Sequence, residues 1–154
     1  MAEIPQRQVV PAFTVVGLAA RTNNPREMSP EGRIGPLWQA FYTAADARIP
    51  GVSANAPVFS VYTGYEADHN GDYDVVIGRA VPDSVQTPPG MSRIAILEAV
   101  YLVFPAAGSR PEAIVAAWRR VYDYFALPGI PPRAFTADFE RHSRESVELY
   151  IAIR

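Results

Sequence analysis

Residues 134–140 read Ala-Phe-Thr-Ala-Asp-Phe-Glu, and residues 147–153 read Val-Glu-Leu-Tyr-Ile-Ala-Ile. In the first stretch apolar and polar side chains alternate, which is typical of a strand with one buried face. The second stretch alternates in the same way and places its aliphatic side chains on one side. Residues 141–146 connect the two stretches. The pattern therefore predicts an antiparallel hairpin.

This hairpin places carboxylates among aromatic side chains. Phe139 precedes Glu140, and Glu148 lies two positions from Tyr150. A carboxylate near aromatic faces suits an organic cation, because both the charge and the ring quadrupole attract it. We therefore hypothesise that the chain binds small aromatic cations.

Composition excludes several other classes of protein. The 154 residues fit a single domain over 1–154, and the absence of cysteine excludes disulfides, thiolate metal sites and cysteine catalysis. The formal net charge is −2 and the 14 basic residues, all Arg, form no stripe, so direct nucleic-acid binding is not expected. The first seven residues contain no apolar h-region of a signal peptide, and no stretch approaches the length of a membrane span. We expect a cytoplasmic protein with no membrane partner.

The rest of the chain alternates between strands and helices. The apolar patterns predict further strands at 7–21, bent at Pro11, and at 58–66, 73–81 and 92–104. A helix is predicted from Pro36 to the break at 49–51, after a loop that extends to Gly35. A second helix follows Ser109 and Glu112, which have the spacing of a capping box.

The predicted elements form an internal repeat. Residues 7–81 and 92–154 each read as strand, helix, strand, strand. The hairpins superpose without a gap, so that Tyr65-Glu66 lies over Phe139-Glu140, and the helices match at Trp38 and Trp118. Two such units predict an α+β fold, a tandem βαββ repeat that forms one antiparallel sheet with helices on one face. A central cleft between the two units is a common position for a ligand.

Several of these segments, in this order, resemble a known family. They are Pro36-Leu37-Trp38 before a helix, residues 61–68, residues 71–78, Trp118, and residues 133–140. Together they look like the GyrI-like domain, the effector-binding domain of many AraC-type transcription activators, over about 11–153. The resemblance implies a tandem βαββ fold with an aromatic-lined cleft and a buried acidic residue that receives cationic drugs or dyes. It places that acid at Glu140 and an aromatic wall residue at Tyr150.

The chain departs from the regulators of this family in one respect. Its 154 residues leave no room for a helix-turn-helix domain. It is therefore similar to the stand-alone members, including cationic-drug-binding proteins carried on integron cassettes. A role in transcription would require a separate DNA-binding protein as partner.

Each candidate site residue also has a purely structural interpretation. The candidate ligand-binding residues are Glu140, Trp118, Tyr150, Phe139, Tyr65, Glu66, Trp38 and Tyr101. A strand Glu is most often a solvated carboxylate or the partner of an Arg such as Arg133 or Arg141. Tryptophans at helical spacing are most often core residues.

Signals for catalysis and cofactors are missing. His69 and His142 are isolated from other metal ligands, and there is no nucleophile elbow, phosphate loop or dinucleotide fingerprint. No catalytic residue, metal or cofactor is therefore predicted, and a binding protein is expected. The main alternative is a GyrI-like hydrolase of strained electrophilic natural products, with Glu140 as general base and Trp118 as stacking surface. A third alternative is a protein-interaction module.

Overall fold

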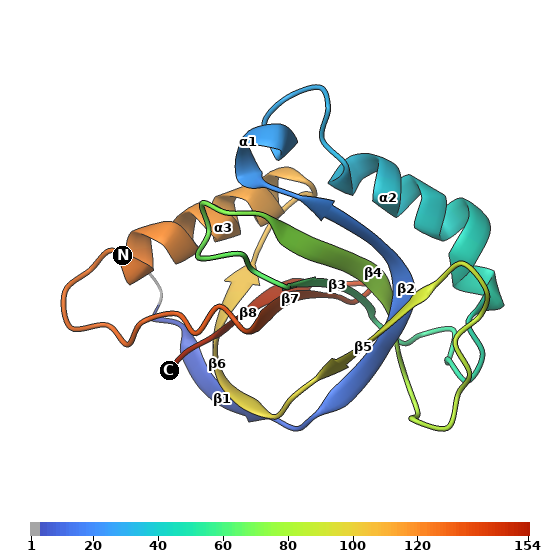
Figure 1. Cartoon of the computed structure of the whole chain (residues 1–154). Helices are drawn as coiled ribbons and strands as arrows, with labels where there is room; N and C mark the ends of the chain where they lie inside the picture. The colour runs from blue at the N-terminus through green and yellow to red at the C-terminus, as the bar shows by residue number, and fades with distance from the viewer. Residues whose placement is uncertain (1–3) are drawn as a thin grey trace.

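In a computed structural model, described for residues 4–154, an antiparallel sheet is combined with few helices (Figure 1). The strands are β1 Gln6–Val10, β2 Phe13–Thr22, β3 Val58–Thr63, β4 Tyr73–Val81, β5 Ser92–Ile96, β6 Ala99–Ala106, β7 Ala137–His142 and β8 Val147–Ala152. The α-helices are α1 Asn24–Glu27, α2 Ile34–Ala40 and α3 Glu112–Phe125; a π-helical turn, η1 Phe41–Ala45, and a 3-10 turn, η2 Asp46–Arg48, extend α2. The predicted α+β class is confirmed.

The sheet order is β1-β6-β8-β7-β3-β4-β2-β5, and the predicted tandem βαββ arrangement is confirmed. Each half contributes a hairpin, β3–β4 or β7–β8, and the hairpins meet where β3 pairs with β7. The hairpin predicted from the opening stretches is present, with Glu140 opposite Leu149. Figure 1 shows α2 and α3 over the same face of this central part of the sheet.

The two ends of the strand order are joined through the chain itself. β1 continues into β2 across Pro11 and Ala12, and β5 continues into β6 across Leu97 and Glu98. Because β1 pairs with β6 while β2 pairs with β5, these two long segments lie side by side and the sheet closes on itself (Figure 1). The predicted bend at Pro11 is present, since proline cannot donate to the ladder. The predicted single strand over 92–104 is wrong because residues 97 and 98 interrupt it.

Alternate residues of the strands face two different cores. The inner core, inside the closed sheet, contains Val15, Val61, Tyr101, Phe139 and Tyr150 among its buried residues. The rings of Phe139 and Tyr150 stack there, 4.6 Å apart between centroids. On the outer face, one cluster packs beneath α2 and a second beneath α3, and Trp118 contacts both. Neighbouring residues of one strand therefore belong to opposite sides of the sheet.

Two facing glycines allow β2 and β4 to approach closely. Gly17 and Gly78 are register partners. A Cβ atom on Gly17 would lie 1.9 Å from the carbonyl oxygen of Ile77, and one on Gly78 would lie 2.1 Å from that of Val16. Side chains at these positions would collide with backbone, so the close crossing requires glycine.

Helix starts differ from the prediction in two places. The expected capping box is wrong: α3 begins at Glu112 after Pro111, without a side-chain cap, and Ser109 contributes its carbonyl oxygen to Ala113 N–H instead. The expected loop before Gly35 contains α1, which Asn23 caps by accepting from the N–H of Arg26.

Candidate functional site

A cavity of about 770 Å³ lies between α2, α3 and the outer face of the central strands. This volume falls within the range of roughly 300–1,000 Å³ that is usual for small-molecule sites. Aromatic rings dominate its wall: Trp38, Tyr42, Tyr62, Tyr65, His69, Tyr73, Trp118, Tyr122 and His142. Glu140 lines the same cavity. The fold therefore provides a hollow with an aromatic wall and a carboxylate in it.

Glu140 is held on β7 by three side chains from different elements. Its side chain is 5% exposed. Oε2 accepts hydrogen bonds from the hydroxyl of Tyr62 on β3 at 2.8 Å and from Nε1 of Trp118 on α3 at 2.7 Å. Oε1 lies 2.7 Å from Nε2 of His142, also on β7. These contacts fix the orientation of the carboxylate, because hydrogen bonds to an ionised acceptor are stronger than neutral ones.

Two buried phenols of the cavity, those of Tyr62 and Tyr73, remain protonated at neutral pH. Burial, followed by the negative charge of Glu140, raises the pKa of Tyr62 well above its ordinary value. Burial also raises the pKa of Tyr73, with a smaller contribution from the charge of Glu27. These hydroxyls therefore act as hydrogen-bond donors, and the fixed negative charge of this wall comes from carboxylates.

His142 links the carboxylate to helix α2. Its ring packs against Trp38 with centroids 4.7 Å apart, while its Nε2 faces Glu140. The sequence-based view of His142 as an isolated histidine missed this role. Period-2 alternation could have identified it, because residues 140 and 142 share one face of a strand.

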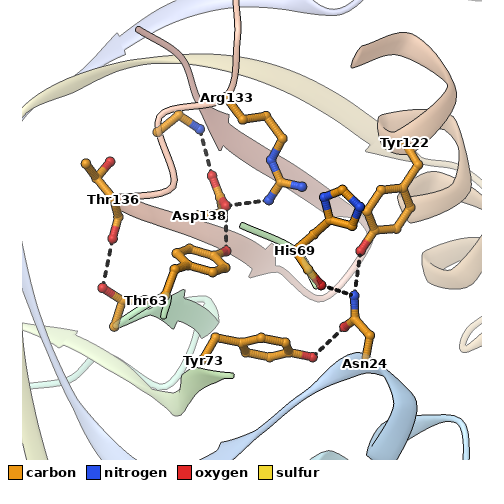
Figure 2. Close-up of polar contacts among 10 residues, drawn as sticks. Asn24, Thr63, His69, Tyr73, Tyr122, Arg133, Thr136 and Asp138 are labelled. Atoms are coloured by element: carbon orange, nitrogen blue, oxygen red, sulfur yellow. Dashed lines mark hydrogen bonds and ion pairs between the residues drawn. The ribbon is translucent and has the colours of Figure 1, made fainter. Parts of the chain in front are cut away.

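A second polar cluster adjoins the first on the same side of the sheet. Asp138 is fully buried, and its Oδ2 accepts from Nη2 of Arg133 at 2.8 Å and from the hydroxyl of Tyr65 at 2.6 Å. Its Oδ1 accepts from the N–H of Ala152 at 2.8 Å (Figure 2). The guanidinium of Arg133 also lies over the ring of Phe135, 4.4 Å from the ring centroid. Burial, then the charge of Asp138, raises the pKa of Tyr65, which keeps this phenol a donor.

Asn24 ties three elements together at one side of the cavity (Figure 2). Its Oδ1 accepts from the hydroxyl of Tyr73 at 2.7 Å. Its Nδ2 donates to the carbonyl of His69 at 3.0 Å and to the hydroxyl of Tyr122 at 3.1 Å. The start of α1, the β3–β4 connection and helix α3 are thus joined through one side chain.

Helix α2 is positioned by a carboxylate in place of an ordinary cap. The carboxylate of Glu27 accepts from the N–H groups of Arg33 at 2.8 Å and Ile34 at 3.0 Å, and it also bonds the hydroxyl of Thr22. These are the N–H groups that a helix start leaves unpaired. This arrangement positions α2 and therefore Trp38, which lies on α2 and lines the cavity.

The structure separates the eight sequence-based candidates into two groups. Glu140, Trp118, Trp38 and Tyr65 line the cavity. Phe139, Tyr150 and Tyr101 do not line it; they belong to the inner core. Glu66 is exposed in the connection after β3.

The reason for this separation is strand geometry. Phe139 is next to Glu140 in sequence and so points to the opposite face of β7, and Tyr150 is its cross-strand partner on the same inner face. The expectation that these residues share a pocket with Glu140 is therefore corrected. Glu66 lies beyond the end of β3 while Glu140 is within β7 opposite Ser60, so the two acids do not occupy equivalent positions.

Within residues 4–154 there is no group of three or more His, Cys, Asp or Glu side chains that could hold a metal ion. None of the helices in this part of the chain has the length and apolar character needed to cross a membrane.

Comparison with known proteins identifies the family. The family described as Cass2, integron-associated effector binding protein, matches residues 8–153. The chain belongs to the Cass2 family. The GyrI-like resemblance inferred from the sequence is confirmed, and so is membership of a family of small-molecule effector-binding proteins.

Individual relatives of this Cass2-family protein are similar along nearly their full length. An integron cassette protein from the mobile metagenome of Vibrio cholerae is 31% identical, with a TM-score of 0.83, and the match covers 99% of this chain and 97% of that one. A candidate transcriptional regulator of Bacillus subtilis strain 168, YobU, is 27% identical over 90% of each chain. A protein solved with bound tetraphenylphosphonium, SAV2435, shares the fold at 19% identity and a TM-score of 0.72, over 97% of this chain and 93% of that one.

Proposed function

We propose that this Cass2-family protein captures amphipathic organic cations that contain several aromatic rings, with Glu140 as the counter-charge. The observation that carries the proposal is the position of Glu140, a buried carboxylate on the wall of an aromatic cavity. Its donors are a phenol, an indole and an imidazole, and no Arg side chain of residues 4–154 forms an ion pair with it.

A buried anion without a fixed cation selects for positive charge. Removing a carboxylate from water is costly, and an incoming cation offsets that cost when it enters the same low-dielectric space. An anionic ligand group placed beside Glu140 would be repelled instead. The charge of Glu140 thus explains why the ligand should be positively charged. The hydrogen bonds to Glu140 explain why the carboxylate keeps its position when no ligand is bound.

The aromatic wall accounts for the ligand's size and chemistry. Trp38 and Tyr42 stack with centroids 5.9 Å apart on the α2 side, and Trp118 meets Tyr62 edge-on at 5.3 Å. Such rings gain apolar contact area and attract a cation through their faces. The fold shared with the tetraphenylphosphonium-bound protein supports this choice of ligand class. We infer that binding serves sequestration or sensing, the latter through a separate regulator protein.

A pair of ligands with one shape and opposite charge tests the proposal. Isothermal titration should show that tetraphenylphosphonium binds and that tetraphenylborate does not. Glu140→Gln should weaken phosphonium binding by roughly 1–3 kcal/mol, about 5- to 150-fold, because it removes the charge and keeps the shape. Glu148→Gln is the matched control, since Glu148 lies on the adjacent strand outside the cavity, 3.7 Å from Arg141. Equal phosphonium affinity of the wild type and Glu140→Gln would refute the proposal.

A second candidate function uses the same carboxylate as a general base. Glu140 lies within hydrogen-bond distance of His142, a side chain that can accept or return a proton. In this alternative the protein hydrolyses a strained electrophilic ring, with Trp118 as the stacking surface. Product formation from a reactive cyclopropane, abolished in Glu140→Gln, would favour hydrolysis. Tight phosphonium binding without such turnover favours capture.

A further inference from the structure

Arg133 has hydrogen-bonding capacity that the fold does not use. Its side chain is 6% exposed, and Nη2 donates to Asp138. Nε and Nη1 are buried, each with less than 1 Å² exposed, and have no partner among the described residues. An unpaired buried donor is destabilising, and native structures rarely leave one without a reason. This side chain therefore calls for a functional explanation.

The unused donors belong to the cavity that contains Glu140. Arg133 lines this cavity together with His69 and Tyr122. In Figure 2 the terminal guanidinium nitrogen that does not face Asp138 points to the side where His69 and Tyr122 lie. The guanidinium plane is fixed by Asp138 on one edge and by the Phe135 ring on one face. A donor held this rigidly loses little entropy when it binds a ligand.

The charge of Arg133 is already matched inside the protein. Asp138 balances it at 2.8 Å, and Glu140 adds a further negative charge to the cavity wall. An anionic ligand would gain little from an arginine that is already paired, and Glu140 would repel it. An uncharged oxygen acceptor, such as a carbonyl, can take the spare N–H groups without this penalty.

We infer that Arg133 forms a second polar subsite of the cavity, which donates a hydrogen bond to an uncharged acceptor oxygen of a ligand whose cationic part pairs with Glu140. This inference rests on the proposed function and narrows its ligand class. The preferred ligand carries a positive charge and, separated from it by an aromatic framework, a carbonyl oxygen.

The ring of His69 lies next to this subsite in the same cavity (Figure 2). It lies 5.3 Å from the Tyr122 ring and 6.3 Å from the Phe135 ring, between centroids. In the described part of the chain, its backbone carbonyl is hydrogen-bonded to Asn24, whereas its imidazole has no hydrogen bond. The ring can therefore rotate aside while the connection that carries it stays anchored.

The test uses phosphonium cations that differ by one oxygen. The (4-acetylphenyl)triphenylphosphonium ion carries a carbonyl where the (4-isopropenylphenyl)triphenylphosphonium ion carries a methylene of similar shape. The corresponding 3-acetylphenyl and 3-isopropenylphenyl ions form a second pair, in which the oxygen lies at a different distance from the phosphonium centre. Titration calorimetry of the wild type should show that the acetyl member of at least one pair binds roughly 3- to 10-fold more tightly, the worth of one net hydrogen bond. The (4-carboxyphenyl) ion should bind more weakly than its acetyl counterpart.

Two variants assign this preference to Arg133. Arg133→Lys keeps a charge for Asp138 but has no second terminal nitrogen, so the ratio of the acetyl affinity to the isopropenyl affinity should fall to about one. Arg79→Lys is the matched control: Arg79 pairs with Asp46 at 2.8 Å, outside the cavity lining, and this variant should retain the preference. His69→Ala, which leaves Arg133 in place, should increase the preference by opening space in the cavity beside Arg133.

Specific outcomes would overturn the subsite. These are equal affinities within both pairs in the wild type, a preference that survives in Arg133→Lys, or tightest binding of the carboxyphenyl ion. If Arg133→Lys does not fold, an unchanged or smaller preference in His69→Ala overturns it. Failure of every phosphonium to bind would refute the proposed function itself, whereas binding of both members with equal affinity would refute the subsite alone.

Discussion

The indole N–H of Trp118 donates to Oε2 of Glu140 at 2.7 Å and so joins helix α3 to the central strand β7. The tryptophan that forms part of the cavity wall therefore also orients the carboxylate. One substitution at this position should affect both the stability of the ligand-free protein and the binding of a cation.

Replacing Trp118 by Phe should lower the free energy of unfolding by about 1.5–3 kcal/mol, because a hydrogen bond to a buried charged group is lost while most of the ring remains. Urea denaturation followed by circular dichroism measures this change. Trp38→Phe is the matched control: Trp38 also lines the cavity and packs on His142, but its indole N–H has no hydrogen-bond partner among the described residues. A similar loss in both variants would argue that packing, rather than the bond to Glu140, stabilises α3.

Alkaline pH should destabilise the protein through its buried phenols. The pKa values of Tyr62 and Tyr65 are raised well above the ordinary value of a tyrosine, mainly by burial, and that of Tyr101 is raised to about 12. Their protonated forms are favoured in the folded state, so their contribution is complete below the unfolded pKa of about 10 and is lost as pH rises toward the folded values.

The free energy of unfolding should therefore decrease above pH 10, by up to about 1.4 kcal/mol per pH unit for each such phenol. Urea titrations at several pH values between 9 and 12 measure the slope. Tyr62→Phe should make that slope shallower, because one titrating phenol is removed. A slope that is unchanged in Tyr62→Phe would show that Tyr62 ionises alike in both states.

Adding a methyl group at Gly78 should severely destabilise the fold. The new Cβ would lie 2.1 Å from the carbonyl oxygen of Val16, so β2 and β4 would have to separate. We expect Gly78→Ala to cost about 3 kcal/mol or more, at the large end for single substitutions. Gly35→Ala is the control, because a Cβ there meets nothing within 4 Å and alanine favours helix α2 by roughly 0.5–1 kcal/mol. Thermal unfolding that is equal in the two variants would contradict the close crossing.

Removing the side chain of Asn24 should loosen one side of the cavity. Asn24→Ala deletes its hydrogen bonds to His69, Tyr73 and Tyr122. Hydrogen exchange should accelerate in residues 66–72 and in the C-terminal half of α3, with little change in β7 and β8, because those strands are held by their own ladder. Asn70→Ala is the control, since the side chain of Asn70 forms no hydrogen bond among the described residues and its backbone N–H bonds Asp68. Uniform acceleration across the sheet in Asn24→Ala would indicate global destabilisation instead.

The fold could be predicted largely because its signals are local. Alternation in residues 134–140 and 147–153 identified the β7–β8 hairpin, and the internal repeat indicated the second one. The closure of the sheet could not be predicted in this way. It depends on the register between β1–β2 and β5–β6, segments about half the chain apart, and no local pattern encodes that pairing.

The candidate site was predicted less completely for a geometric reason. Glu140, Trp118, Trp38 and Tyr65 were identified from residue type and repeat, and they line one cavity. Phe139 was grouped with Glu140 because it is adjacent in sequence, and Tyr150 because of the family resemblance, although the period of a strand sends both to the other face. His142 and Arg133 were considered as an isolated histidine and a surface partner, since their contacts depend on tertiary packing.

The two faces of strand β7 have different surroundings, so substitutions on each face have different consequences. On β7, Phe139 faces the inner core while Asp138, Glu140 and His142 face the cavity side. Under the proposed function, substitutions at Glu140 or His142 act on the cavity, whereas those at Phe139 alter the scaffold. New specificities are thus accessible without disturbing the ring stack of Phe139 and Tyr150, which allows the ligand repertoire to diversify on a constant frame.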